Sequence, residues 1–298
     1  MLIPMILRTL RIALPAALFA AMVTLPFGLA QSRRPEKPKS VRLYILDCGV
    51  ITGVSGDSMG FKPGELATTD MVTPCFLIAH PRGTMIWDTG EIADRDVKTD
   101  GTPTKQGAFT VTRPLLPQLA ALGYTPANIT YLALSHYHGD HVANAYLFAG
   151  STWIVQQVEH DAILASKGKT PGKGPGQVNY AFFEPLEHTK TMILNNEDHD
   201  VFGDGTVVIK FTPGHTPGHQ SLFLNFAKTG PVVLSGDLYH YPEEMTAHKI
   251  PSFDFNKEQT AKSREALEAF VQQKHAQLWI QHDAIGSKKL KKAPEYYE

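Results

Sequence analysis

Ser135-His136-Tyr137-His138-Gly139-Asp140-His141 places three imidazoles and a carboxylate within six residues of one another. The stretch follows residues 129–134 (Ile-Thr-Tyr-Leu-Ala-Leu), a short apolar run that predicts a buried strand. Because His136 and His138 are two residues apart, a chain that leaves this strand still extended points both side chains to the same side.

The turn that follows directs the last two polar side chains of the stretch into the same space. Gly139 permits a sharp change of direction, and Asp140 stands where a helix can begin, with residues 142–147 following. Imidazole nitrogen and carboxylate oxygen are the ligands that zinc and similar metals prefer. A lone histidine usually belongs to a polar loop, but no ordinary packing need explains this density. The stretch therefore predicts a metal site.

The whole chain has the length and composition of one large globular domain. It contains 298 residues, of which 43% are hydrophobic and 19% are charged, and we place the domain at residues 41–298. The formal net charge of −1 gives no electrostatic reason to expect a nucleic-acid partner.

The first thirty residues differ from the rest and predict export. Two arginines precede the apolar run 12–23, acidic residues are absent, and a small-x-small site at 28–30 precedes Gln31. We interpret residues 1–30 as a signal peptide and the proline-rich segment 31–40 as a linker. The mature protein would then be periplasmic, with no stable membrane span after cleavage. The alternative is an uncleaved membrane anchor.

Only two cysteines are present, Cys48 and Cys75. Two cysteines cannot build a cysteine-rich zinc site, and export would make a disulfide feasible. The sequence does not place their Cα atoms within bridging range, so a bridge and two buried thiols both remain open.

Apolar runs and turn residues predict strands that alternate with helices. Asn256, followed three residues later by Gln259, predicts the start of the longest helix. Strands are expected at 41–46, 75–79, 84–87, 129–134, 152–156, 207–211, 221–224, 232–235 and 278–281, helices at 114–122, 158–165 and 257–274, and long loops at 49–70 and 167–176.

Four metal-type ligands fall just beyond the ends of such strands, namely His136, His215, Asp237 and His282. Strands that alternate with helices favour a layered α/β architecture with ligands at strand ends.

The motif H-x-H-x-D-H after a strand, together with the distant His215, Asp237 and His282, resembles the signature of the metallo-β-lactamase superfamily. The resemblance implies an α/β fold, a four-layer αβ/βα sandwich with the metal site along one edge of two packed sheets. It also implies two divalent metal ions, with zinc favoured, of which the first is held by His136, His138 and His215, the second by Asp140, His141 and His282, and both by a bridging Asp237.

Such a centre implies hydrolysis, because two metals lower the pKa of a bridging water and present hydroxide at neutral pH. Asp88, in the sequence Asp-Thr-Gly, resembles the superfamily's early aspartate, which would orient a ligand imidazole from outside the metal shell. The alternative is a turn-forming aspartate. The remaining histidines are expected to be surface or structural residues: His80, His160, His188, His199, His219, His248 and His275.

Three further stretches resemble the N-acyl homoserine lactonase branch, namely 212–223, 235–239 and 294–296. This resemblance implies a quorum-quenching lactonase. In that branch a tyrosine three residues after the bridging aspartate contacts the substrate, whereas this chain has His240 there and Tyr239 one residue earlier. We expect either side chain to donate a hydrogen bond to the developing oxyanion.

Other readings of the same ligands stay open. An exported β-lactamase of the same fold is one, although zinc β-lactamases generally lack a bridging carboxylate at Asp237. A glyoxalase II-like thioesterase or ester hydrolase would use the same seven ligands, and a non-catalytic binding protein is the least favoured reading. The sequence leaves open the acyl-chain preference, the native metal and the oligomeric state. Relatives in the branch are often dimers, so a homodimer is considered.

Overall fold

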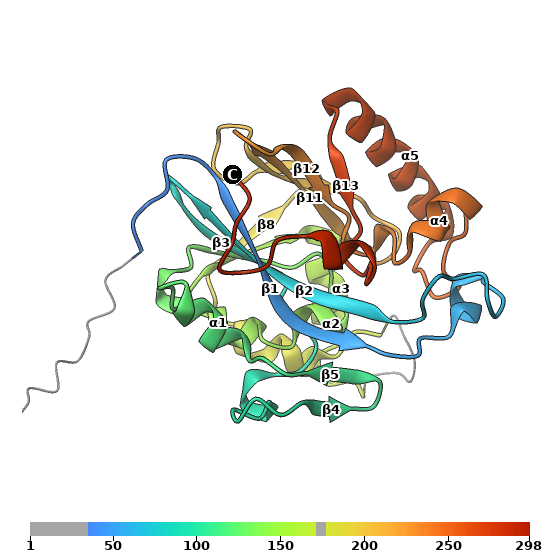
Figure 1. Cartoon of the computed structure of the whole chain (residues 1–298), viewed down its shortest axis with the longest axis horizontal. Helices are drawn as coiled ribbons and strands as arrows, with labels where there is room; N and C mark the ends of the chain where they lie inside the picture. Colours follow the sequence, from blue (N-terminus) through green and yellow to red (C-terminus); the bar gives the residue numbers. More distant parts are fainter. Residues whose placement is uncertain (1–34, 171–176) are drawn as a thin grey trace, which may run out of the picture. The chain divides into compact units, whose positions relative to one another are not determined.

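The computed structural model describes residues 35–170 and 177–298, which form an α/β sandwich built on two sheets (Figure 1). The predicted signal peptide and the first residues of the predicted linker lie outside the described residues. Within the described ranges, no helix has the length and apolar character needed to cross a membrane.

The first sheet is mixed and contains eight strands in the order β4-β5-β1-β2-β3-β6-β7-β8. The β3–β6, β6–β7 and β7–β8 pairs are parallel. The remaining pairs are antiparallel. Its strands are β1 (Arg42–Ile51), β2 (Met71–His80), β3 (Gly83–Trp87), β4 (Thr104–Gln106), β5 (Phe109–Val111), β6 (Tyr131–Ala133), β7 (Thr152–Gln156) and β8 (Thr191–Leu194).

The second sheet contains five strands in the order β13-β12-β11-β10-β9, and only the β12–β13 pair is parallel. Its strands are β9 (His199–Asp200), β10 (Val207–Phe211), β11 (Gln220–Phe226), β12 (Gly230–Leu234) and β13 (Gln277–Trp279). The α-helices are α1 (Leu115–Ala121), α2 (Gly139–Val142), α3 (Gln157–Ala165), α4 (Pro242–Ala247) and α5 (Lys257–Lys274).

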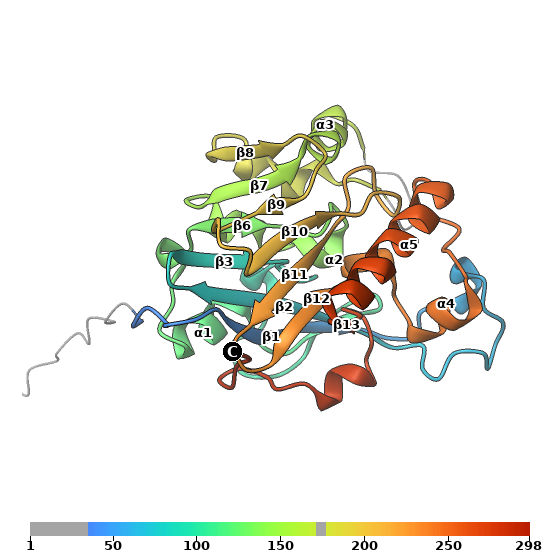
Figure 2. The same cartoon turned by 90° about the horizontal axis from the view of Figure 1, so that it is seen from above.

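Three buried clusters show that the chain forms four layers. Alternate residues of each strand face opposite sides of a sheet, so Leu43 and Ile45 pack between the two sheets while Tyr44 and Leu46 face the helices. The middle cluster joins the first sheet to residues of β10, β11 and β12. On the outer face of the second sheet, Leu267 of α5 packs against strand residues, and Figure 2 shows α5 lying along that sheet. This arrangement is the expected αβ/βα sandwich.

Local sequence signals account for several helix boundaries. The side chain of Asn256 accepts hydrogen bonds from the backbone N–H groups of Glu258 and Gln259, each at 3.1 Å, and α5 begins at Lys257 as predicted. Helix α1 lies within the predicted range 114–122. The expected helix after the histidine stretch is shorter than predicted, because α2 ends at Val142.

The first strand is longer than its apolar run. β1 extends into the first residues of the predicted loop 49–70 and ends at Ile51. Its pairing with β2 is interrupted between Asp47 and Val50. Gly49 lies in this irregularity at φ +130°, where a Cβ would approach Glu91 to 2.4 Å. Because this bulge interrupts the alternation of side chains between the two faces of the sheet, the residue pattern did not predict the last part of β1. The last strand is shorter than predicted, since β13 ends at Trp279 and Gln281 lies beyond it.

The question of the two cysteines is answered by the pairing of β1 with β2. Cys48 and Cys75 form a disulfide, and their Cα atoms lie 5.8 Å apart. Both are buried in the cluster between the first sheet and its helices.

We expect replacement of both cysteines by alanine to lower the free energy of unfolding by about 3 kcal/mol, because the bridge closes a loop of intermediate length in the unfolded chain. Urea denaturation of the double variant and the oxidised wild type, both freed of metal, measures the difference. An unchanged denaturation midpoint would contradict this expectation.

Candidate metal centre

Four of the predicted ligands each follow the end of a strand, one strand in the first sheet and three in the second. His136 comes three residues after β6, His215 four after β10, and Asp237 and His282 three after β12 and β13. Because these ends meet at one edge of the two packed sheets, residues far apart in sequence converge there. His138 precedes α2 with extended backbone angles, while Asp140 and His141 stand in its single turn.

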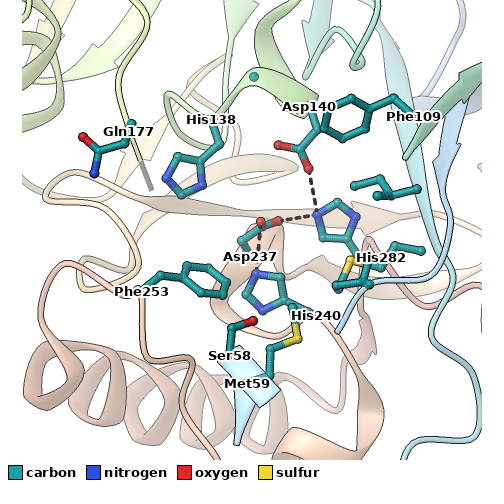
Figure 3. Close-up of a pocket in the computed structure, with 14 residues that line it drawn as sticks. Ser58, Met59, Phe109, His138, Asp140, Gln177, Asp237, His240, Phe253 and His282 are labelled. Atoms are coloured by element: carbon teal, nitrogen blue, oxygen red, sulfur yellow. Dashed lines mark ion pairs between the residues drawn. The ribbon is translucent and has the colours of Figure 1, made fainter. Parts of the chain in front are cut away.

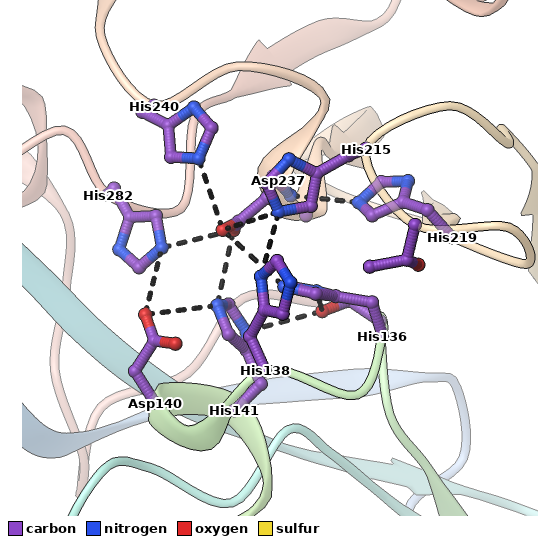
Figure 4. A network of polar contacts seen from close by, with 12 residues as sticks. His136, His138, Asp140, His141, His215, His219, Asp237, His240 and His282 are labelled. Carbon is purple, nitrogen blue, oxygen red and sulfur yellow. Dashed lines mark hydrogen bonds and ion pairs between the residues drawn. The ribbon is translucent and has the colours of Figure 1, made fainter. Parts of the chain in front are cut away.

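The structure brings all seven predicted ligands together in two groups that share one carboxylate (Figure 4). Within each group, the donor atoms lie within 4.8 Å of one another. The groups are His136, His138, His215 and Asp237, and Asp140, His141, His282 and Asp237.

Asp237 turns one oxygen toward each group. Its Oδ2 lies 3.6 Å from His136 Nε2 and 3.5 Å from His215 Nε2. Its Oδ1 lies 3.2 Å from His141 Nε2 and 3.0 Å from His282 Nε2. Two ligand atoms around a tetrahedral zinc stand about 3.3 Å apart, given zinc–ligand bonds of about 2 Å. These separations therefore suit one metal ion on each side of Asp237.

Buried polar atoms without partners support the same reading. Among the described residues, four atoms of this cluster are buried and have no hydrogen-bond partner, namely His136 Nε2, His138 Nε2, His141 Nε2 and Asp237 Oδ1. An uncompensated buried polar atom costs about 1–3 kcal/mol, so four of them in one cluster require an explanation. A bound cation provides one, because all four atoms are metal-ligand types.

The electrostatics of the cluster favour the ligand forms of most members. Burial, with His141 as the next cause, lowers the pKa of His136 well below its usual value, and burial with His215 does the same for His138. Burial opposes ionisation of Asp237, but the nearby His282 and His141 outweigh it and hold the pKa of that carboxyl well below its usual value. Neutral imidazoles and ionised carboxylates are the forms that bind metal.

Three of the histidines that face Asp237 through Nε2 have a hydrogen-bond partner at Nδ1, which orients the ring. Asp88 Oδ2 lies 2.9 Å from His141 Nδ1, as expected for the early aspartate. Asp254 Oδ1 lies 2.9 Å from His215 Nδ1, and His282 Nδ1 lies 2.8 Å from a backbone carbonyl. Such partners fix the ring tautomer, leaving Nε2 free to bind a metal. Asp254 was not predicted, because no motif marks the loop that carries it.

Glu159 of α3 connects two of the ligand loops. Its carboxylate is buried and accepts hydrogen bonds from the N–H of Tyr137 at 2.9 Å, the hydroxyl of Thr216 at 2.9 Å and the N–H of Gly218 at 2.7 Å. A Cβ on Gly218 would lie 2.5 Å from the Glu159 Cβ, so only glycine allows this approach. The sequence carried no signal for this residue.

Burial raises the pKa of Glu159 to about 7 despite its three donors. The folded state therefore binds this proton more tightly than the unfolded state, and the stability that it contributes decreases as pH rises from about 4.5 through 7. We expect the free energy of unfolding of wild type relative to Glu159→Gln to be smaller at pH 8 than at pH 5. Urea titrations of both proteins with chelator present measure it, and a pH-independent difference would refute it.

His219 is structural, as expected, but it also supports the site. Its Nε2 accepts a hydrogen bond from the N–H of Asp237 at 2.9 Å, and its Nδ1 donates to the carbonyl of Thr212 at 3.0 Å. Burial lowers the pKa of His219 to about 3, which keeps Nε2 an acceptor. Gly236, at φ +56°, lets the chain turn there, since a Cβ would lie 2.6 Å from His219 Nε2.

The structure distinguishes the two candidates for the substrate contact, because Tyr239 does not line the cavity. Its backbone is extended, so its side chain points to the opposite side from that of the next residue, toward α5. The phenol hydroxyl donates to Glu268, and the ring lies 4.2 Å from the guanidinium of Arg264. His240 instead lines the cavity, with Nε2 3.3 Å from Asp237 Oδ2.

The metal-type ligands form one wall of a cavity of about 390 Å³ (Figure 3). Its other walls are mainly apolar and come from β1, the loop after β1, β2, β5 and the loop before α5. Apolar lining residues are Ile51, Val54, Met59, Met71, Phe109 and Phe253, and polar lining residues include Ser58, His138, Asp140, Gln177, Asp237, His240 and His282. Part of the predicted loop 49–70 therefore lies over the site. The loop 167–176 is described only to residue 170.

Comparison with known proteins agrees with this geometry. The profile of the metallo-beta-lactamase superfamily matches residues 68–281. The chain is 31% identical to N-acyl homoserine lactonase AttM of Azorhizobium caulinodans, over 87% of this chain and 99% of that protein. It is 27% identical to N-acyl homoserine lactonase AiiA of Bacillus thuringiensis subsp. kurstaki, over 86% of this chain and 98% of that one.

A solved structure of an N-acyl homoserine lactone hydrolase, with the product N-hexanoyl-L-homoserine bound at its catalytic metal center, superimposes with a TM-score of 0.68 at 25% identity. The alignment covers 86% of this chain and 99% of that one. Fold and site together define a metal-dependent hydrolase. The chain belongs to the metallo-beta-lactamase superfamily, in the branch of the N-acyl homoserine lactonases.

Proposed function

We propose that this protein opens the lactone ring of N-acyl homoserine lactones by hydrolysis and so degrades quorum-sensing signals. The observation that carries the proposal is the position of Asp237, which presents one oxygen to each of two ligand groups at the wall of an apolar cavity. Homoserine lactones combine a polar ring with an apolar acyl chain, and the cavity offers surfaces for both.

The seven ligands suit two divalent ions, with zinc favoured. One ion would be held by His136, His138 and His215, the other by Asp140, His141 and His282, with Asp237 between them. Such a pair of ions supplies, when bound, Lewis acidity and an activated water at neutral pH. Asp88 and Asp254 keep two ligand rings in place from behind.

His240 is the residue of this chain best placed to assist the substrate oxygens. Its Nε2 edge faces Asp237 and the cavity, as Figure 3 shows. We propose that the imidazolium form of His240, which has an N–H at each nitrogen, donates a hydrogen bond from Nε2 to the oxygen that gains charge as the ring opens, a contribution that typically amounts to about 10²–10³ in rate. Burial opposes this form, but Glu244 and Asp237 outweigh it and raise the pKa of His240 to about 10.

The proposal includes export to a periplasm after removal of residues 1–30. The disulfide between Cys48 and Cys75 supports it, because such bonds persist in oxidising compartments. Fractionation of bacteria that express the full chain, followed by N-terminal sequencing, tests it. A full-length cytoplasmic product would refute it.

Hydrolysis assays on the purified, metal-replete protein test the activity. The substrates are short- and long-chain N-acyl homoserine lactones, a simple γ-lactone, a thioester and a chromogenic cephalosporin. Opening of the homoserine lactones with little cephalosporin turnover is expected. Cephalosporin or thioester turnover without lactone opening would replace the proposal by a β-lactamase or by a glyoxalase II-like thioesterase.

A further inference from the structure

Behind His240 lies a buried carboxylate that holds the imidazole at its far nitrogen. Glu244 Oε1 lies 3.2 Å from His240 Nδ1 and accepts a hydrogen bond from the backbone N–H of His240 at 3.1 Å. Because a carboxylate can only accept, Nδ1 must carry the proton of this contact. The ring is thereby turned so that Nε2 faces Asp237 and the cavity.

Glu244 is held in turn by an arginine from another helix. Arg264 of α5 donates from Nη2 to Glu244 Oε2 at 2.5 Å, from Nε to the carbonyl of Leu238 at 2.8 Å and from Nη1 to the carbonyl of Lys249 at 2.5 Å. Glu244, Arg264 and His240 are all buried, so this chain of contacts is shielded from water. Charge-assisted bonds in such surroundings restrict side-chain rotation strongly.

The arrangement repeats one seen twice elsewhere in the site. Asp88 stands behind His141 and Asp254 behind His215, each on Nδ1, while Nε2 of both rings faces Asp237. His240 has the same pattern, with Glu244 behind and Nε2 3.3 Å from Asp237 Oδ2. It nevertheless stands outside both ligand groups. A ring held in this way, but not needed for the groups, is available to a substrate.

We propose that Glu244, anchored by Arg264, is a positioning residue that sets the imidazole of His240 for contact with the substrate. The inference rests on the proposed function, since it assigns Glu244 a part in the same reaction. Glu244 acts only through the ring and touches no substrate itself, because it does not line the cavity.

A double-mutant cycle tests the coupling. Glu244→Gln is expected to lower kcat for lactone opening by about 10- to 100-fold, the usual effect of losing such a partner, with little change in KM. In a His240→Ala background the same substitution should change kcat by less than about twofold, because the ring through which it acts is gone. Equal losses in both backgrounds would overturn the proposal and leave Glu244 a purely structural residue.

The matched control is Glu268→Gln, which alters another carboxylate near Arg264 that bonds Tyr239 rather than His240. It should retain activity and metal content. If Glu244→Gln fails to fold, Glu244→Asp replaces it, since it keeps the charge facing Arg264 but withdraws the carboxylate from the ring. Metal content and denaturation midpoints are measured for every variant.

A second readout is independent of turnover. Imidazole ¹⁵N–¹H spectra of the metal-free protein should show a protected His240 Nδ1 proton that is lost in Glu244→Gln and kept in Glu268→Gln. Absence of that proton in wild type would overturn the inference even if lactones are opened. A protected proton in a protein that opens no lactone would instead refute the proposed function and leave the positioning intact.

Discussion

Asp237→Ala should abolish lactone hydrolysis, with kcat/KM falling at least about 10³-fold, because the substitution removes the only carboxylate shared by the two ligand groups. Each group then keeps three protein ligands, but the link between the groups is lost. We expect metal content to fall as well, since the Nε2 atoms of four predicted ligands lie 3.0–3.6 Å from that carboxylate, namely those of His136, His141, His215 and His282.

Asp237→Asn sharpens this test, because an asparagine offers one carbonyl oxygen in place of two carboxylate oxygens. It should retain more metal than the alanine variant while still losing most activity. Asp161→Asn, at an exposed position on α3, is the matched control and should behave as wild type. Elemental analysis after gel filtration gives metal content, and a fully active Asp237→Ala would rule out a bridging role.

Removal of metal should eliminate activity and lower thermal stability together. The seven ligand side chains come from both sheets and crowd four imidazoles around one carboxylate, so the metal-free state leaves buried polar atoms uncompensated. Ligand binding to the folded state alone contributes about 4 kcal/mol when the free ligand stands at 1,000 times its Kd.

Dialysis against a chelator, followed by calorimetry and by titration with Zn²⁺, Mn²⁺, Co²⁺ or Fe²⁺ under anaerobic conditions, measures both effects. Activity and melting temperature should return together, and the stoichiometry at full recovery counts the ions. His188→Ala, at an exposed histidine that belongs to neither ligand group, should show the same recovery as wild type. Unchanged activity in the chelated protein would exclude a metal-dependent reaction.

The ligand set was predictable because local spacing carries it. Four of the seven ligands lie in the short stretch that follows β6, namely His136, His138, Asp140 and His141. The other three follow apolar strands that are evident in the sequence. Asp88 was predictable for the same reason, since it follows β3 directly. The helix from Lys257 was predictable from its asparagine cap.

Other features depend on contacts that a sequence does not display. β4 and β5 have three residues each, β4 pairs with β5, and β5 pairs with β1. They are too short to be predicted from a run of apolar residues. The choice between Tyr239 and His240 depends on the backbone after Asp237, where a one-residue shift turns a side chain from the cavity to α5. Glu159, Glu244 and Asp254 reach the site from separate helices or loops.

The division of ligands between the sheets has a consequence for how the enzyme is made. The first sheet supplies His136, His138, Asp140 and His141, and the second supplies the other three, so each ligand group needs both sheets. A folding intermediate with one sheet formed would hold an incomplete group and bind metal weakly. Metal uptake would therefore report that the two sheets have packed together, and the chain would acquire its activity only after assembly is complete.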